Sequence, residues 1–207
     1  FNKFTKSYMF ENSSFFNKEY RGKFLDIGCF HPTRHNNTYK MYKNGWRGIN
    51  IDLNPLTIDL FNFSRRNDIN INAAISDNEE NKTLYFVDEL NTQNTLEANH
   101  LSFLKNHHNL REEEISKQII KTRRLDKILD SHNFNDIDFM NIDVEGHELN
   151  ILNSIDFNKY RIKFICIEKI DHNDQAKLIN EKLNAILEKN NYVLEKKLDF
   201  NFIYKKN

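Results

Sequence analysis

The first segment that could do chemistry is a turn-like loop followed, one apolar run later, by an acid. Residues 26–32 (DIGCFHP) form the loop, and Asp52 ends the next apolar run about 20 residues further on. A carboxylate at that spacing can accept hydrogen bonds from both hydroxyls of a ribose. A dinucleotide would also need a glycine-rich loop for its pyrophosphate, whereas here Gly28 is followed by bulky Phe30 and His31. The pattern favours a cofactor with adenosine and no phosphate, namely S-adenosylmethionine. The alternative is that Gly28 only makes a turn and Asp52 only caps a helix.

A second group of reactive side chains lies within residues 143–148 (DVEGHE), after another apolar run. Asp143 and Glu145 are two residues apart, so they share a face if the extended geometry persists. Glu168 ends the next apolar run, which we expect to lie beside the first. Methyl transfer to a neutral hydroxyl needs an acceptor held near the methyl carbon and a means of removing its proton. This segment contains residue types that could supply that means.

Three interpretations of the second group stay open. In the first, the acids cap a helix, because negative charge is favourable at a helix N-terminus and Glu148 stands at a capping position. In the second, His147 or His31 is a general base, because a histidine pKa lies near neutrality. In the third, the carboxylates of Asp143, Glu145 and Glu168 hold a divalent cation such as Mg²⁺. The catalytic candidates are therefore Asp143, His147, His31 and Glu145.

The elements that must position these residues alternate between strand and helix. Apolar, β-branched runs occupy residues 23–28, 48–52, 69–75, 137–143 and 164–168. Helix-like stretches occupy residues 38–43, 55–65, 146–154 and 174–189. This alternation predicts βαβ units around a parallel sheet, with a ligand bound at the carboxyl ends of its strands.

The C-terminal part breaks the alternation. Residues 192–198 and 200–205 are strand-like with no helix between them, which predicts an antiparallel hairpin at the edge of the sheet. Residues 83–87 and 119–122 are candidates for extra strands. Residues 97–117 are polar and weakly periodic, which predicts a solvated surface segment, with a lid or insert over the site as the alternative.

Composition and length exclude several classes of protein. The chain has 207 residues, 30 basic and 30 acidic, which predicts one domain over residues 1–207 with an N-terminal extension over about 1–20. The balanced charge argues against nucleic-acid binding, and no apolar run approaches the ~20 residues that span a bilayer. Cys29 and Cys166 fit buried thiols of a cytoplasmic protein. The chain starts with Phe1 rather than Met, which leaves open what precedes it.

Several short blocks, in order and spacing, resemble those of the FkbM-type S-adenosylmethionine-dependent methyltransferases. The blocks are DIG at 26–28, HP at 31–32, NTY at 37–39, GWRGI at 45–49, DLNP at 52–55, NAAISD at 72–77, TRRLD at 122–126, DFMNIDVEGHE at 138–148 and IE at 167–168. No single block is specific, but their order is. The resemblance covers residues 22–168, and the terminal hairpin is compatible with it.

This resemblance implies the α/β, Rossmann-like fold of class I methyltransferases: a mostly parallel seven-stranded sheet with helices on both faces and a C-terminal antiparallel hairpin. It implies that residues 26–28 face the methionine end of the cofactor, Asp52 holds its ribose, and residues 72–74 lie beside its adenine. The candidates for cofactor contact are Asp26, Gly28, Asp52, Asn72, Ala73 and Ala74. Many members have a more glycine-rich first loop, so whether His31 faces cofactor or substrate stays open.

We therefore predict an S-adenosylmethionine-dependent methyltransferase. The resemblance implies O-methylation of a hydroxyl on a sugar, glycan or other small molecule, with a role in polysaccharide biosynthesis. A nucleotide-dependent oxidoreductase and a non-catalytic module that binds an adenosyl ligand are the alternatives. A divalent metal is an open candidate cofactor, no nucleic-acid partner is expected, and the acceptor and the oligomeric state are not determined by the sequence.

Overall fold

The computed structural model describes residues 16, 19–86, 94–98, 105, 111–169 and 173–207. The strands are β1 Lys23–Ile27, β2 Arg47–Asp52, β3 Ile69–Asn72, β4 Ala74–Ile75, β5 Asn81–Phe86, β6 Ser116–Arg123, β7 Asp136–Ile142, β8 Arg161–Glu168, β9 Tyr192–Leu198 and β10 Asn201–Lys206. The helices are α2 Tyr39–Lys43, α3 Pro55–Ser64, α5 Leu125–Ser131, α6 Glu148–Asn153 and α7 Asp174–Lys189, with a 3₁₀ turn η1 at Glu112–Glu114.

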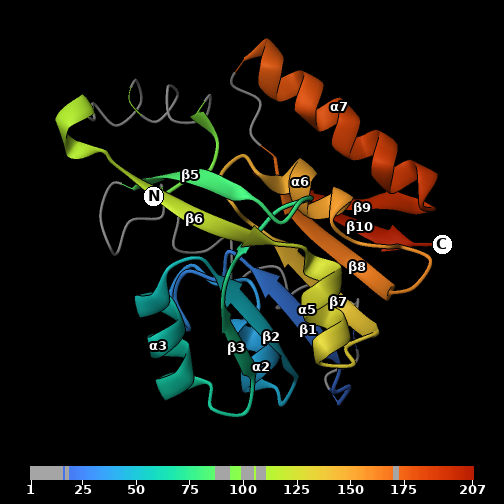
Figure 1. Cartoon of the computed structure of the whole chain (residues 1–207). Helices are drawn as coiled ribbons and strands as arrows, with labels where there is room; N and C mark the ends of the chain where they lie inside the picture. The colour runs from blue at the N-terminus through green and yellow to red at the C-terminus, as the bar shows by residue number, and fades with distance from the viewer. Residues whose placement is uncertain (1–15, 17–18, 87–93, 99–104, 106–110, 170–172) are drawn as a thin grey trace.

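Most strands form one seven-stranded sheet, in the order β3-β2-β1-β7-β8-β10-β9 (Figure 1). The first five of these strands pair in parallel, and β10 pairs antiparallel with both β8 and β9. The predicted mostly parallel sheet with a terminal hairpin is thereby confirmed. The first strand of the hairpin, β9, forms the edge of the sheet, because β10 lies between β8 and β9.

The core explains why the central strands are so apolar. Successive residues of a strand point to opposite faces, and both faces of β1 are covered. Leu25 packs in the cluster that includes residues of α5, α6 and α7, whereas Phe24 packs with Met41 of α2 and with Trp46. Helices therefore cover both faces, as predicted. The two cysteines are free and buried, also as predicted.

A small second sheet, in the order β4-β6-β5, corrects one predicted strand. Residues 69–75 are not one strand: β3 ends at Asn72, and β4 leaves the main sheet to pair in parallel with Thr122 and Arg123 of β6. The break follows Asn72, which pairs with the last residue of β2, Asp52, and the Asp52 carbonyl oxygen accepts the Ala73 N–H at 3.0 Å. Figure 1 shows β5 and β6 side by side as a ribbon above α3. The two extra strands predicted near residues 83 and 119 are confirmed by this ribbon.

One helix was not predicted. Helix α5 buries Leu125, Ile128 and Leu129, whose i, i+3, i+4 spacing is the sequence signal for it. Of the candidate lid, residues 97–98, 105 and 111–117 are described, and the last of these form η1 and the start of β6. The other residues of that segment, and most of the predicted N-terminal extension, lie outside the described residues.

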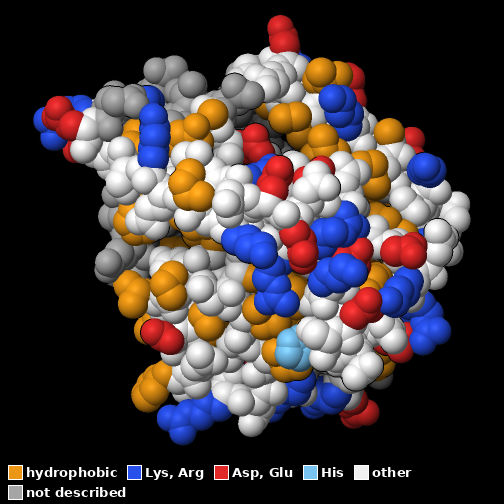
Figure 2. Space-filling model, in the orientation of Figure 1, with side chains coloured by type: hydrophobic (Ala, Val, Ile, Leu, Met, Phe, Trp, Pro, Cys, Tyr) orange, Lys and Arg blue, Asp and Glu red, His pale blue; other side chains and the backbone are white. Residues whose placement is uncertain are grey.

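The charges on the surface are mixed, in agreement with the equal numbers of basic and acidic residues. On the face that Figure 2 shows, Lys and Arg side chains are interspersed with Asp and Glu rather than gathered into one basic surface. Among the described residues, no helix is both long enough and apolar enough to cross a membrane.

Candidate active site

A cavity of about 420 Å³ lies where the parallel strands end, at the carboxyl edge of the main sheet. The predicted site residues in its wall are Gly28, Asp52, Ala73, Ala74, Asp143, Glu145, His147 and Glu168. Three further candidates, Asp26, His31 and Asn72, lie outside this wall. The tertiary structure thus gathers candidates from the ends of five parallel strands, β1, β2, β3, β7 and β8, at one place, as expected for an open α/β sheet.

Gly28 is required by the close approach of two strand ends. Its φ is +75°, and a Cβ at this position would lie 1.8 Å from the Asp143 carbonyl oxygen. The Gly28 N–H donates to the Ile51 carbonyl at 2.9 Å, and the Asp143 N–H donates to the Ile27 carbonyl at 3.0 Å. The loop after β1 therefore packs directly on the segment after β7, and only glycine fits between them.

Asp52 ends β2 with its carboxylate held by two backbone N–H groups. Oδ2 accepts from Phe30 and Oδ1 accepts from Asn54, both at 2.9 Å. Desolvation by burial raises the pKa of Asp52 to about 6, against the effect of these two bonds. Each carboxylate oxygen still has a lone pair for a further donor, so the group can accept from two ligand hydroxyls.

Asp26 is fully buried behind the first loop. Its carboxylate accepts from Thr38 Oγ1 at 2.7 Å and from Asn36 and Asn141 Nδ2 at 2.9 Å. Burial raises the pKa of Asp26, and the bond from Thr38 opposes that rise. Asp26 therefore supports the first loop through its hydrogen bonds to these side chains, and it does not line the cavity.

The first loop keeps its shape with few glycines because buried polar groups hold it. Phe30 and His35 adopt positive φ values of 50° and 48°. The buried guanidinium of Arg65, at the end of α3, donates to the carbonyl of Pro32 and to Asn36 Oδ1. These contacts hold the positive φ values of Phe30 and His35 in place. Glycine would adopt such φ values without strain and would not need the same support.

His31 and Asn72 support neighbouring backbone. His31 Nδ1 accepts from the N–H groups of Thr33 and Arg34, each at 3.1 Å. Its pKa is lowered by desolvation and then by the charge of Arg34. Asn72 Nδ2 donates to the carbonyls of Asp52 and Leu53, so it fixes the end of β2.

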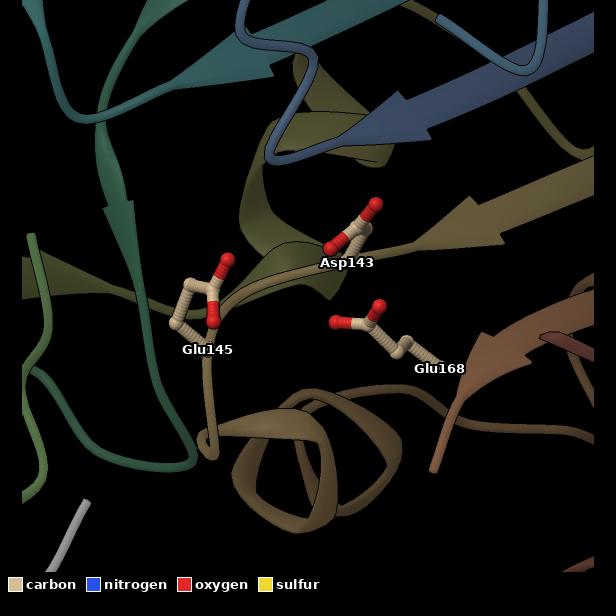
Figure 3. Close-up of side chains that lie close together, drawn as sticks. All are labelled: Asp143, Glu145 and Glu168. Carbon is tan, nitrogen blue, oxygen red and sulfur yellow. The ribbon is translucent and has the colours of Figure 1, made fainter. Parts of the chain in front are cut away.

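Three carboxylates of the cavity wall lie close together (Figure 3). Asp143 and Glu145 follow β7, Glu168 ends β8, and one oxygen of each lies within 4.8 Å of the others. Figure 3 shows all three pointing into a common space. Hard oxygen donors at this separation suit Mg²⁺, and a single carboxylate among them suits proton removal from a hydroxyl.

His147 has both ring nitrogens engaged within the protein. Nδ1 lies 2.6 Å from Glu97 Oε1, and Nε2 lies 3.1 Å from Ser76 Oγ. The side chain is 2% exposed. Both ring nitrogens therefore have protein partners in this arrangement, and the role of His147 as a general base stays a prediction.

Glu148 holds the turn that precedes α6. Its Oε1 accepts from the N–H groups of Gly146 at 3.1 Å and Val144 at 3.3 Å, so its side chain bonds to the preceding turn and forms no helix cap, while its carboxyl group stands in the first turn of α6. Burial raises the pKa of Glu148 to about 7 from an ordinary 4.5. The native state therefore binds a proton at Glu148 more tightly than the unfolded chain does.

Glu148→Gln is expected to stabilise the protein above pH 7. Because the native pKa is raised, the stability from this group is complete below pH 4.5 and is lost as the pH rises through 7. Glutamine keeps the acceptor oxygen without the buried charge, so the gain should approach about 2–3 kcal/mol at pH 8. Urea unfolding from pH 5 to 8 measures it, with the exposed Glu181→Gln as control. An equal response in both variants would contradict the buried-charge account.

Other residues of the site were not predicted. Phe30, His35, Asn94 and Leu96 line the cavity, and Glu97 bonds to His147 from the same stretch. Phe30 belongs to the loop at residues 26–32, but no sequence pattern indicates its positive φ. Residues 94–97 carry no local pattern that indicates a site, because their position depends on contacts with residues far along the chain.

Comparison with known families gives a match that covers most of the chain. Residues 26–194 match the model of the methyltransferase FkbM domain. Among curated proteins, no sequence matches significantly.

Solved structures match mainly in fold. The structure of the methyltransferase FkbM from Methylobacillus flagellatus KT matches 96% of this chain at 13% identity with a TM-score of 0.52. The chain spans about half of that structure, 47% of its length. A Methanococcus jannaschii fibrillarin pre-rRNA processing protein (14% identity, 92% and 69% of the two chains, TM-score 0.45) and a Geobacter metallireducens GS-15 precorrin-6y C5,15-methyltransferase (12%, 90% and 82%, TM-score 0.42) are more distant.

Proposed function

The chain belongs to the methyltransferase FkbM domain family, and from that premise we propose that it transfers the methyl group of S-adenosylmethionine to a hydroxyl oxygen. The acceptor class in this proposal is a sugar, a glycan or another small molecule. The observation that carries the proposal is the cavity at the carboxyl edge of the sheet, whose wall contains Asp52 and a group of three carboxylates.

The cavity wall supports an adenosyl ligand in particular. Asp52 offers lone pairs to two ribose hydroxyls, while Ala73, Ala74 and Ile75 offer a small apolar surface to a flat base. The first loop lacks the further glycines of a pyrophosphate cradle, because bulky Phe30 and His31 follow Gly28. These features favour S-adenosylmethionine over a dinucleotide, and so favour a methyltransferase over the oxidoreductase alternative.

The chemistry divides between the cofactor and this chain's own residues. S-adenosylmethionine, when bound, supplies an electrophilic methyl group for an in-line displacement. The chain positions the acceptor hydroxyl, and we assign proton removal to Asp143, with Glu145 and Glu168 beside it. The alternative is that the three carboxylates hold Mg²⁺, which would lower the pKa of the acceptor hydroxyl.

The test of the function is thermal melting of the protein with S-adenosylmethionine, S-adenosylhomocysteine and NADH in turn, with EDTA or with Mg²⁺. A ligand at 100 times its Kd stabilises the native state by about 2.7 kcal/mol. We expect stabilisation by the two adenosyl ligands, followed by turnover in a screen of hydroxyl acceptors. Stabilisation by NADH alone would support the oxidoreductase, and binding without turnover would support the non-catalytic module. Turnover that is lost with EDTA and restored by Mg²⁺ would assign the carboxylates to a metal.

Asp52→Ala is expected to weaken S-adenosylhomocysteine binding by about 30- to 100-fold, because two charge-assisted hydrogen bonds are lost. In the wild type, affinity should also fall as the pH drops through 6, since the pKa of Asp52 is raised to about 6 and only the charged form accepts both hydroxyls. Calorimetry from pH 5 to 8 measures both effects. Asp68→Asn is the matched control, because Asp68 accepts from Gly48 N and Asn50 Nδ2 away from the cavity. Unchanged affinity in Asp52→Ala would remove Asp52 from the ribose.

A further inference from the structure

A chain of three polar side chains crosses from the cavity wall into the protein. Glu97 Oε1 contacts His147 Nδ1 at 2.6 Å, and His147 Nε2 contacts Ser76 Oγ at 3.1 Å. Ser76 is fully buried and His147 is 2% exposed, whereas the Glu97 side chain is 32% exposed. The mechanism proposed above uses none of these contacts. Because Ser76 is out of reach of any ligand, the trio is no nucleophilic triad.

Glu97, at the outer end of this series of side chains, belongs to residues 94–98, which we call the strap. Thr95 pairs with Tyr85 of β5 through two backbone hydrogen bonds, of 2.9 and 3.1 Å. Thr95 Oγ1 donates to the Glu145 carbonyl at 2.8 Å and accepts from the Glu97 N–H at 3.0 Å. The strap therefore ties the β5–β6 ribbon to the segment that carries the cavity carboxylates.

The strap is part of the cavity wall. Asn94 and Leu96 line the cavity, on either side of Thr95. Ser76, at the far end of the polar chain, directly follows the Ala74–Ile75 strand that lines the cavity as well. Glu97 is thus connected, through one imidazole, to the end of the segment that we assign to the adenine.

We propose that Glu97, acting through His147, is a positioning residue that holds the strap against the adenine end of the bound cofactor. The inference rests on the proposed function, because it takes the ligand to be adenosyl. Without the Glu97 contact, the strap loses its link to His147, and Leu96, which lies between Thr95 and Glu97, is held less firmly. The ligand must then order the strap on binding, and that cost in conformational entropy weakens the affinity.

The experiment compares wild type, Glu97→Ala, Glu97→Gln and the exposed Glu79→Ala as matched control. Hydrogen exchange of the Thr95 and Tyr85 amides is measured without ligand, together with the melting temperature. Binding is measured with S-adenosylhomocysteine and with 5′-methylthioadenosine, which lacks the amino-acid end. The second probe separates an effect at the adenine end from an effect at the methionine end.

We expect Glu97→Ala to speed exchange of both amides and to raise both Kd values by about tenfold, the effect of one charged hydrogen bond. Glutamine retains an acceptor oxygen at the same reach, so Glu97→Gln should recover most of the protection and affinity. Glu79→Ala should match the wild type. Equal losses for the two ligands would place the effect at the adenine end.

The proposal would be overturned by unchanged exchange in Glu97→Ala, or by faster exchange with affinities equal to those of the wild type. A loss for S-adenosylhomocysteine alone would also overturn it, since the strap would then act at the methionine end. If the wild type itself binds neither adenosyl ligand, that binding result shows that the proposed function fails, whereas the ligand-free exchange still reports whether Glu97 holds the strap.

Discussion

Asp143→Asn is expected to lower methyl-transfer turnover by about 10²- to 10⁴-fold, the range of a general base, while S-adenosylhomocysteine affinity stays within about threefold of wild type. Asp143 lines the cavity directly after β7, where its carboxylate meets those of Glu145 and Glu168. Asparagine keeps the size of the side chain but cannot accept a proton from the acceptor. Turnover is measured as S-adenosylhomocysteine formed at saturating cofactor, with the acceptor that the screen identifies.

The matched control is Asp136→Asn, at the opposite end of the same strand. Asp136 pairs with Arg161 at 2.5 Å and is exposed, so its replacement should leave turnover unchanged. Near-normal turnover in Asp143→Asn would remove Asp143 from proton removal. A variant that loses activity only when Mg²⁺ is limiting would indicate that the carboxylate binds metal instead.

Gly28→Ala is expected to destabilise the protein by about 3 kcal/mol or more and to abolish cofactor binding. The added Cβ would lie 1.8 Å from the Asp143 carbonyl oxygen, and backbone on both sides has to move to relieve that clash. The positive φ of +75° adds strain for any residue with a Cβ. At this chain length, a loss of about 3 kcal/mol lowers the Tm by about 6–12 °C.

Gly45→Ala separates the clash from the strain. Gly45 also has a positive φ, +88°, but its added Cβ would meet only the flexible side chain of Arg21. It should therefore cost about 1–2 kcal/mol and leave cofactor binding intact. Thermal melting of both variants, with and without S-adenosylhomocysteine, makes the comparison. Equal losses in the two would show that the contact between the first loop and Asp143 is unimportant.

Local sequence determined the order and type of most elements. Asn54 and Pro55 marked the start of α3, where the Asn54 side chain accepts the Leu56 N–H at 3.0 Å. The run before Gly28 and the run before Asp143 became the adjacent central strands β1 and β7. Such features depend on residues within a few positions of one another, because capping, side-chain periodicity and turn formation are local.

The tertiary structure decided which of the candidate residues reach the cavity. Asp26 and Asp52 both stand near a strand end in the sequence, yet Asp52 lines the cavity and Asp26 is buried beneath the first loop. In the β1–β2 register Asp26 lies opposite Asn50, so Asp52 lies on the same face but two positions nearer the carboxyl end of the sheet, and what covers each position is set by elements distant in the chain. Asn141, which donates to Asp26, is such a distant residue.

The strap is the clearest case of a feature that only the fold creates. Glu97 meets His147 across 50 positions and His147 meets Ser76 across 71 positions. Neither pair has a sequence signal, because the contact arises from the departure of β4 from the main sheet to pair with β6. The sequence by itself determined the strands, the loop glycine and the acids at the strand ends, since these follow from local propensity. The packing of distant segments decided which acids share the cavity and what forms its wall.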